Sequence, residues 1–241
     1  MDKNCGSVPN PTEPILYDHT MPIIEVVRQM DVAGLQKLMA VSGRIAEETQ
    51  RQFQELSTTG KVKKPAIYMY KGEVYNGLNE SSFSREELVF AQNHLRILSG
   101  LYGMLRPLDQ IMPYRLEMAT RIHIKDTKNL YHYWKEYITR QLQADLDASG
   151  SDVLYNLASD EYYKVIDKNT IRAQIVHFEF YDMKDGKPTF VSFNAKKARG
   201  LMAAYIIKNR IKEPKMVSVF NEEGYQLRPE LSKEDEMVFV R

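Results

Sequence analysis

The chain has 241 residues, of which 43% are hydrophobic, 27% charged and 10% aromatic, and its formal net charge is +1. This length can bury a substantial core, and the balanced charge excludes a protein that attracts nucleic acid through an overall basic field, so any affinity for anions must come from a local patch. A single cysteine, Cys5, excludes an intramolecular disulfide framework, and no run of apolar residues approaches the roughly 18 that a membrane span needs.

The first residues contain no apolar segment of a signal peptide, so we expect a cytoplasmic protein. Met1–Pro14 is polar and proline-rich, which indicates an extended segment, and Cys5 within it is expected to have no role. From about Thr20 to Gly60 the apolar residues recur at helical spacing, and Ser42 is placed to cap a helix that runs along "GRIAEETQRQFQEL".

The middle of the chain begins with a predicted strand, Ala66–Tyr70, because β-branched and aromatic residues lie there between a proline and a glycine. Ser84 with Glu87 predicts a capping box at the start of a helix. Further elements follow: a helix over Asn129–Ala148 that contains Trp134, a strand over Asp152–Ser159, a β-hairpin over 173–194 that turns at Asp185-Gly186, a helix over 195–211, and a closing strand in "EMVFVR".

Helices and strands therefore interleave along the sequence, without repeats, low-complexity tracts or long linkers. This order predicts one compact α/β (mixed α+β) domain over residues 1–241, with a mixed sheet and flanking helices.

The stretch Leu95–Met118 has an unusual composition, because an otherwise apolar run carries Gly100, Gly103, Arg106, Pro107 and Arg115. One interpretation is a helix-hairpin-helix element, in which glycines bring backbone amides close to a nucleic-acid phosphate. The other is a short buried strand followed by an irregular, glycine-containing loop that lines a cleft. Pro107 argues against a regular second helix, and the pattern alone leaves both open.

A group of basic residues is predicted at the start of the last helix. Lys196, Lys197 and Arg199 follow a capping Asn194, at the end of a helix where the dipole disfavours cations. An anion bound by the free backbone amides and these side chains would explain why basic residues occur at this end of the helix.

The remaining candidates lie after predicted strands. Lys71 follows the strand that ends at Tyr70, and Asn156 to Lys164 places small and polar residues at a strand's carboxyl end, where α/β folds build ligand sites. Asp160-Glu161 could supply a base or a metal ligand, although capping is the favoured interpretation. The five histidines show no metal-ligand spacing, and His177 is expected to be structural. We therefore predict no catalytic residue, metal or cofactor.

Several motifs together identify a family. "KGEVYNGL", "LRILSGLYGMLRPLDQIMPYRLEM", "NLASDEYYK", "AKKARGLM", "FNEEGY" and "MVFVR" resemble, in this order, the bacterial YaaA family of peroxide-stress-response proteins. The resemblance implies a cytoplasmic DNA-binding protein that limits free intracellular iron and oxidative damage to DNA and proteins. It also implies a positively charged cleft, a helix-hairpin-helix element within "LSGLYGMLRP", and no established reaction.

The partner expected from the resemblance is double-stranded or structured DNA, bound by a monomer through the phosphate backbone with little sequence preference. The expected DNA- or anion-binding residues are Lys71, Gly100, Tyr102, Gly103, Arg106, Tyr114, Arg115, Asn156, Ser159, Lys196, Lys197 and Arg199. The alternative is an enzyme or binder for a small phosphorylated, nucleotide-like ligand in the same cleft, with Tyr114, Asn156 and Asp160 or Glu161 in contact with it.

One departure from the family stands out. Family members open with a hydrophobic strand that runs into Ser-Pro-Ala-Lys, and this sequence has neither. Without them we expect an exposed sheet edge or a core gap and a less basic cleft.

Overall fold

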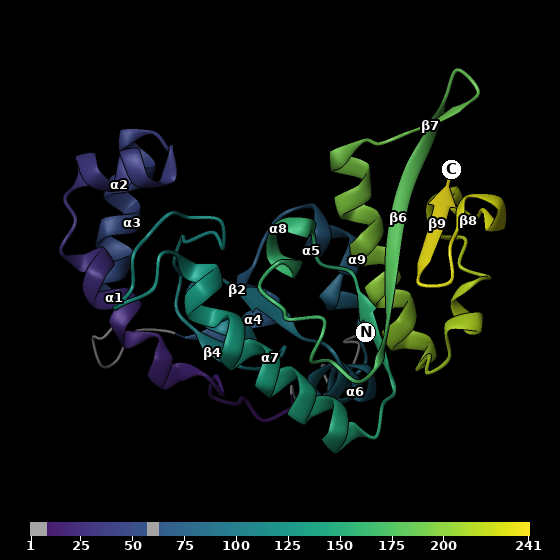
Figure 1. Ribbon diagram of the computed structural model, residues 1–241, viewed down its shortest axis with the longest axis horizontal. Coiled ribbons are helices and arrows are strands. Elements are labelled where there is room, and N and C mark those ends of the chain that lie inside the picture. The colour runs from purple at the N-terminus through teal and green to yellow at the C-terminus, as the bar shows by residue number, and fades with distance from the viewer. Residues whose placement is uncertain (1–8, 57–62) are drawn as a thin grey trace, which may run out of the picture.

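The computed structural model describes residues 9–56 and 63–241 (Figure 1). Cys5 and most of the predicted extended segment Met1–Pro14 lie outside this part. Within it, helices and strands alternate along the chain, and the largest sheet mixes parallel and antiparallel strands and is flanked by helices. The predicted mixed α/β class is confirmed. No helix of the described part is long and apolar enough to be a membrane span.

The N-terminal part is helical, as predicted, and consists of α1 (Met21–Arg28), α2 (Val32–Met39) and α3 (Gly43–Glu55). Asp31 caps α2 by accepting a hydrogen bond from Gly34 N at 2.7 Å, and Ala40 ends α2 in the left-handed conformation with φ 51°. Ser42 occupies the N-cap position of α3, although its side chain forms no capping hydrogen bond. α2 and α3 therefore pair as a helical hairpin, which stands at one end of the molecule (Figure 1).

The segment after β1 (Lys64–Pro65) is a short helix, α4 (Ala66–Met69), so the strand predicted over Ala66–Tyr70 is wrong. Distant carbonyls set its conformation, because Ala66 N donates to Asp109 O at 2.9 Å and Ile67 N to Pro107 O at 3.0 Å. β1 itself pairs with β4 (Gln110–Ile111). Tertiary contacts here override the β propensity of the side chains.

Two more helices, α5 (Glu73–Leu78) and α6 (Arg85–His94), precede the unusual stretch. The predicted capping box at α6 is confirmed. Ser84 Oγ accepts from Glu87 N at 3.2 Å, and Glu87 Oε2 accepts from Ser84 N at 2.7 Å.

The stretch Leu95–Met118 forms a tight β-hairpin of β2 (Ile97–Ser99) and β3 (Gly103–Leu105), followed by an irregular segment that contains β4. The interpretation as a short buried strand with a glycine-containing loop is therefore correct, and a helix-hairpin-helix at this place is wrong. No second helix forms here, because Gly103 turns the chain back at φ 70° and the residues after it pair as a strand.

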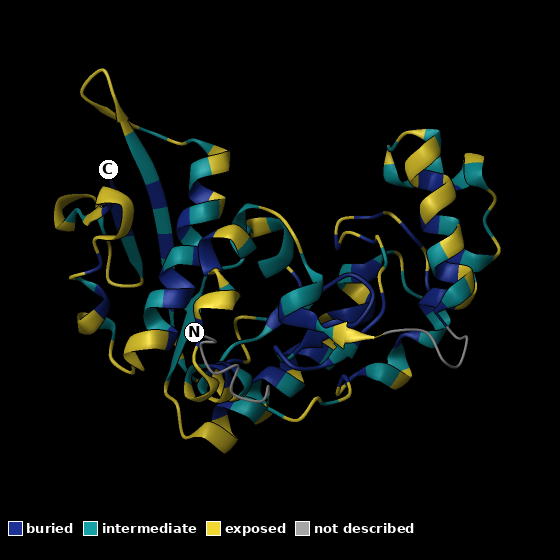
Figure 2. Ribbon diagram, turned by 180° about the vertical axis from the view of Figure 1, so that it is seen from behind, coloured by how far each residue is buried: buried dark blue, intermediate teal, exposed yellow. Residues whose placement is uncertain are grey.

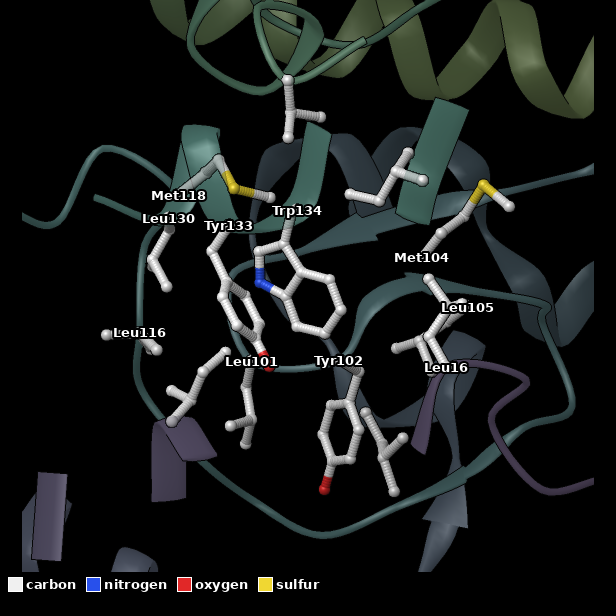
Figure 3. Close-up of a cluster of buried hydrophobic side chains, with 14 of the residues drawn as sticks. Leu16, Leu101, Tyr102, Met104, Leu105, Leu116, Met118, Leu130, Tyr133 and Trp134 are labelled. Atoms are coloured by element: carbon white, nitrogen blue, oxygen red, sulfur yellow. The ribbon is translucent and has the colours of Figure 1, made fainter. Parts of the chain in front are cut away.

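Trp134 and the backbone of the following segment explain the two glycines of this hairpin, and Figure 3 shows Trp134 among its buried neighbours. Its side chain is fully buried, and its Nε1 donates to Gly100 O at 2.9 Å. A Cβ at Gly103 would lie 2.7 Å from the indole ring, and a Cβ at Gly100 would lie 2.3 Å from Leu116 O. The hairpin backbone is thus packed directly against Trp134 and the following segment, in the buried centre of the molecule (Figure 2).

The C-terminal half forms the largest sheet. Its elements are α7 (Leu130–Ser149), β5 (Val153–Asn156), α8 (Asp160–Tyr163), β6 (Gln174–Lys184), β7 (Lys187–Thr189), α9 (Ser192–Asn209), β8 (Gln226–Leu227) and β9 (Glu236–Val240). The strand order is β5-β6-β9-β8, with β7 also paired to β6. β5, β6 and β9 run parallel, and β8 and β7 are antiparallel to their neighbours. Short 3-10 helices fill the connections at Tyr17–His19, Glu80–Ser82, Pro214–Val217, Glu222–Gly224 and Pro229–Leu231.

The predicted hairpin, long helix and closing strand in this half are confirmed, with one shift. α9 begins at Ser192, within the segment predicted to return as a strand. Side chains alternate between the two faces of β6: Val176, Phe178 and Phe180 share a core with α9, so His177 and Glu179 lie on the opposite face.

α9 also crosses α5 at very close range. A Cβ at Gly200 would lie 1.9 Å from Val74 O, and a Cβ at Gly77 would lie 2.1 Å from Lys197 O. Only glycines allow the two backbones to approach in this way, and the contact fixes the rotation of α9 about its axis.

Replacing Gly103 with alanine tests the packing of the hairpin on Trp134. We expect Gly103→Ala to lower the free energy of unfolding by roughly 2 to 4 kcal/mol, because the methyl group adds an overlap with the ring to the strain of a left-handed backbone. The matched control is Gly150→Ala, where φ is 64° but nothing lies within 4 Å of the added Cβ, and where we expect about 1 to 2 kcal/mol. Equal losses in urea denaturation would contradict the proposed overlap.

Candidate functional site

The carboxyl end of β5 and the start of α8 form the most polar region between the helices and the main sheet. Asn156, the last residue of β5, lies opposite His177 of β6, and its Nδ2 lies 3.0 Å from His177 Nδ1. Asn156 Oδ1 accepts from Ala158 N at 3.1 Å. When Asn156 donates to Nδ1, the neutral imidazole carries its proton on Nε2. Asn156 therefore fixes the orientation of His177.

Glu179 lies two residues after His177 on the same face of β6. Glu179 is half-buried, and burial raises the pKa of its carboxyl group, while the nearby positive charge of Arg199 partly opposes the rise. Asp160, at the start of α8, raises the pKa of Glu179 further. Arg199 Nε is buried and has no hydrogen-bond partner.

A cluster of phenols lies on the other side of α8. Tyr114 OH is 2.7 Å from Tyr70 OH and 2.6 Å from Ser99 Oγ, and Ser99 Oγ accepts from Tyr102 N at 2.8 Å. Burial raises the pKa of Tyr70, Tyr75 and Tyr114 above that of a free phenol, and raises the pKa of Tyr162 to about 12. These hydroxyl groups, here called the phenol cluster (Tyr70, Tyr75, Tyr114 and Tyr162), are therefore neutral at neutral pH.

Four of the predicted residues lie in or beside these two regions. Asn156 is the last residue of β5, and Ser159 is the N-cap of α8. Arg199 is half-buried on α9. Tyr114 belongs to the phenol cluster, and Lys71 is exposed directly after Tyr70. That this strand end binds a ligand, as such ends do in many α/β folds, stays a prediction.

Three predicted residues lie in the core. Gly100 and Gly103 are buried, and Tyr102 is 3% exposed. Tyr102 N donates to Ser99 Oγ, and Tyr102 OH accepts from Met112 N at 3.3 Å. The prediction that the amides of this hairpin contact phosphate is therefore corrected: the turn packs on Trp134 and presents no surface to a ligand.

The two arginines of the same stretch have protein partners. Arg106 donates to Asp109 Oδ1 from Nε at 3.1 Å and from Nη2 at 2.8 Å, and Nη2 also donates to Glu13 O at 2.9 Å. Asp109 is fully buried, so Arg106 neutralises a core carboxylate. Arg115 is exposed and pairs with Glu117 at 3.1 Å.

The basic group on α9 differs from the prediction. Because α9 begins at Ser192, Lys196 and Lys197 lie in its second turn, beyond the free amides of its first turn. Lys197 pairs with Glu223, Lys196 is exposed, and Asn194 donates to Asp182 Oδ2 at 2.8 Å instead of capping the helix. The predicted capping role of Asn194 is therefore wrong, and anion binding by this basic group stays a prediction.

Sequence reasoning missed His177, Glu179 and the phenols other than Tyr114. The alternation along β6 places His177 and Glu179 on one face, beside the strand end that Asn156 marks, and this register was the signal that could have identified them. Glu161 Oε1 accepts from Ala119 N at 3.3 Å, which agrees with a structural role for that residue. In residues 9–56 and 63–241, no three His, Cys, Asp or Glu side chains are grouped so that they could hold a metal ion.

A second candidate surface lies at the α2–α3 helical hairpin. Lys37 near the end of α2 and Arg44 in the first turn of α3 are exposed, and that first turn contains no acidic residue. The loop before α7 lies on the same side of the body (Figures 1 and 2). In this loop the buried Ile122 and Ile124 alternate with exposed residues, of which the basic ones are Arg121, His123, Lys125 and Lys128.

The family model described as peroxide stress protein YaaA matches residues 1–231 of the chain, which include every element of the fold except the final strand β9.

The phenol cluster predicts a loss of stability in alkaline solution. A phenol whose pKa is raised keeps its proton in the folded state after the unfolded chain has lost it, so the unfolded state binds fewer protons and the free energy of unfolding falls as pH rises above about 10. Each such phenol contributes at most about 1.4 kcal/mol per pH unit. Urea denaturation across this pH range measures the decline, and Tyr114→Phe should make it shallower. A constant stability through the range would contradict the burial of these hydroxyl groups.

Proposed function

Because the chain belongs to the family of peroxide stress protein YaaA, we propose that it acts in the response to hydrogen peroxide by binding DNA in the cytoplasm. The proposal includes the expectation from the family resemblance that the protein helps to limit free intracellular iron and oxidative damage to DNA and proteins. The family supports the role in oxidative stress, and the surface features of the chain support the DNA contact.

The observation that carries the DNA contact is the α2–α3 helical hairpin. The first amides of a helix have no acceptor within the helix, and the Ser42 side chain does not cap those of α3. The positive end of the α3 dipole and the exposed Arg44 lie in the same first turn of the helix, where a bound phosphate would be stabilised by both. We propose that the phosphate contact suggested by the sequence for Leu95–Met118 lies at α2–α3.

The loop before α7 extends the basic surface. Arg121, Lys125 and Lys128 are exposed, and no ion pair joins them to another described residue. Asp126 is the exposed acidic residue among them. Point charges of this kind contact the phosphate backbone and carry little information on base sequence. We therefore propose binding with little sequence preference, by a monomer.

DNA binding is tested by titration against salt concentration. Log K should fall linearly with log salt, and Lys37→Ala combined with Arg44→Ala should weaken binding to all sequences alike and reduce the slope by about 0.9 for each phosphate that the variant no longer neutralises. The matched control is Lys184→Ala combined with Lys187→Ala, two exposed lysines at the β6–β7 hairpin, which should leave the slope unchanged.

A second pair of variants separates this surface from the predicted basic group on α9. Lys196→Ala with Lys197→Ala should leave DNA affinity unchanged. If this pair abolishes binding while the α2–α3 variant retains it, α9 is the contact surface and the assignment to α2–α3 is wrong.

The effect on iron is tested in cells. Cells that lack the protein should show more electron-paramagnetic-resonance-visible free iron after hydrogen peroxide, and the intact chain should restore the lower level. Expression of the Lys37→Ala, Arg44→Ala variant distinguishes two mechanisms: full restoration would show that limiting iron does not depend on DNA binding at α2–α3.

A further inference from the structure

The imidazole ring of His177 is bonded in the opposite sense to that of His94. In His94, Nδ1 lies 2.8 Å from Phe90 O. A carbonyl oxygen only accepts, so Nδ1 of His94 carries the proton. Nδ1 of His177 instead lies 3.0 Å from the side-chain amide nitrogen of Asn156. This nitrogen only donates, so Nδ1 of His177 is an acceptor.

A second hydrogen bond prevents reversal of the Asn156 amide, because its Oδ1 already accepts from Ala158 N at 3.1 Å. Neutral His177 therefore carries its proton on Nε2. Within residues 9–56 and 63–241, this Nε2 forms no hydrogen bond, and it is not buried. His177 thus has a hydrogen-bond donor of known position that the fold leaves open to a ligand.

His177 lines a pocket of about 540 Å³ beside β6, a size within the range of roughly 300 to 1,000 Å³ that is typical of ligand pockets. The ring of Tyr163, which also lines the pocket, stands edge-on to the imidazole, with the ring centroids 5.1 Å apart at an interplanar angle of 88°. Part of the lining is apolar and comes from Ile171, Ala173 and Ile175. The pocket therefore combines an oriented imidazole with an apolar surface.

The charged residues of this pocket disfavour an anion. Glu234 and Asp235 are exposed residues of the lining, against one basic residue, Lys168. An anion would be repelled by the carboxylates and would lose hydration at the apolar part. A simple ammonium ion would be attracted by the carboxylates but would offer no acceptor to Nε2 of His177. An uncharged molecule with a carbonyl oxygen avoids both problems.

We propose that this pocket binds a small uncharged carbonyl compound with an apolar body, such as an aromatic amide, whose oxygen accepts a hydrogen bond from His177 Nε2. The pocket lies beside β6, whereas the proposed DNA surface uses α2 and α3 at the other end of the molecule (Figure 1). The proposal is therefore independent of DNA binding. It differs from the small phosphorylated ligand weighed from the sequence, and the binding test below separates the two.

The first test determines the tautomer of His177 by nitrogen-15 NMR in mildly alkaline solution, where imidazoles are neutral. The ring signals of His177 and His94 are assigned through their loss in His177→Gln and His94→Gln. His177 should show a protonated Nε2 and an unprotonated Nδ1, and His94 should show the reverse in the same spectrum. A protonated Nδ1 in neutral His177 would overturn the proposal.

The second test follows the same His177 signals during titration with benzamide, benzoate, phenyl phosphate and benzylamine at constant ionic strength. Benzamide should shift the Nε2 signal along a saturable curve, in the millimolar range expected for so small a ligand. The two anions should bind at least roughly threefold more weakly because of the carboxylates. Benzylamine should bind roughly fivefold more weakly because it offers no acceptor.

Variants assign the benzamide contact to one nitrogen. His177→Phe keeps a ring but removes the donor, so it should weaken benzamide binding roughly fivefold. His177→Gln retains an N–H donor and should restore part of the affinity, and His94→Phe is the matched control that should leave it unchanged. Backbone amide signals of Ala173 and Ile175 report binding in all variants, and thermal unfolding checks that each variant folds.

Three results of the binding experiments would overturn the proposal. The first is the absence of a saturable shift with benzamide. The second is binding of benzoate, phenyl phosphate or benzylamine as tight as that of benzamide, which for phenyl phosphate would favour the phosphorylated ligand. The third is a loss of affinity in His177→Gln or His94→Phe as large as in His177→Phe.

Discussion

The burial of Trp134 against the backbone of the β2–β3 hairpin is the contact on which the larger core depends. The indole donates to Gly100 O, and its ring occupies the space where a Cβ of Gly103 would lie. Ser99, in the same turn, receives Tyr102 N and contacts Tyr114 OH. The start of α7, the hairpin and the phenol cluster are therefore held together around one side chain. Gly103 makes room for the tryptophan ring and Gly100 for the backbone at Leu116, so both glycines serve packing.

Local signals predicted most of the fold. The capping box at Ser84, the β-hairpin at Asp185-Gly186 and the amphipathic helix around Trp134 each depend on residues that are neighbours in the sequence, and all three are confirmed. Ala66–Tyr70 was predicted wrongly because its first amides bond to carbonyls some forty residues later in the chain. A pattern of neighbouring residues cannot indicate a hydrogen-bond partner so far away in the sequence.

The candidate site, too, could be predicted only in part. The polar residues at the end of β5 could be predicted from the sequence, because polar residues that follow a strand often form ligand sites in α/β folds. The roles of Gly100, Gly103 and Arg106 could not be predicted. A glycine that packs against an indole and an arginine that pairs with a buried carboxylate give the same sequence pattern as a phosphate-binding loop. The shift of three residues at the start of α9 was enough to move Lys196 and Lys197 out of the first turn. The sequence also does not show that Arg199 Nε has no hydrogen-bond partner among the described residues, which only the three-dimensional structure shows.

The glycine contact between α5 and α9 has a consequence for the order of folding. Gly77 and Gly200 come from opposite halves of the sequence, so their contact closes a long loop. The chain loses conformational entropy on closing this loop before the packing contacts between α5 and α9 can offset the loss. α9 can make this contact only when α5 is already formed. We therefore expect the α5–α9 contact to form late in folding, and its amides to exchange hydrogen faster than those around Trp134.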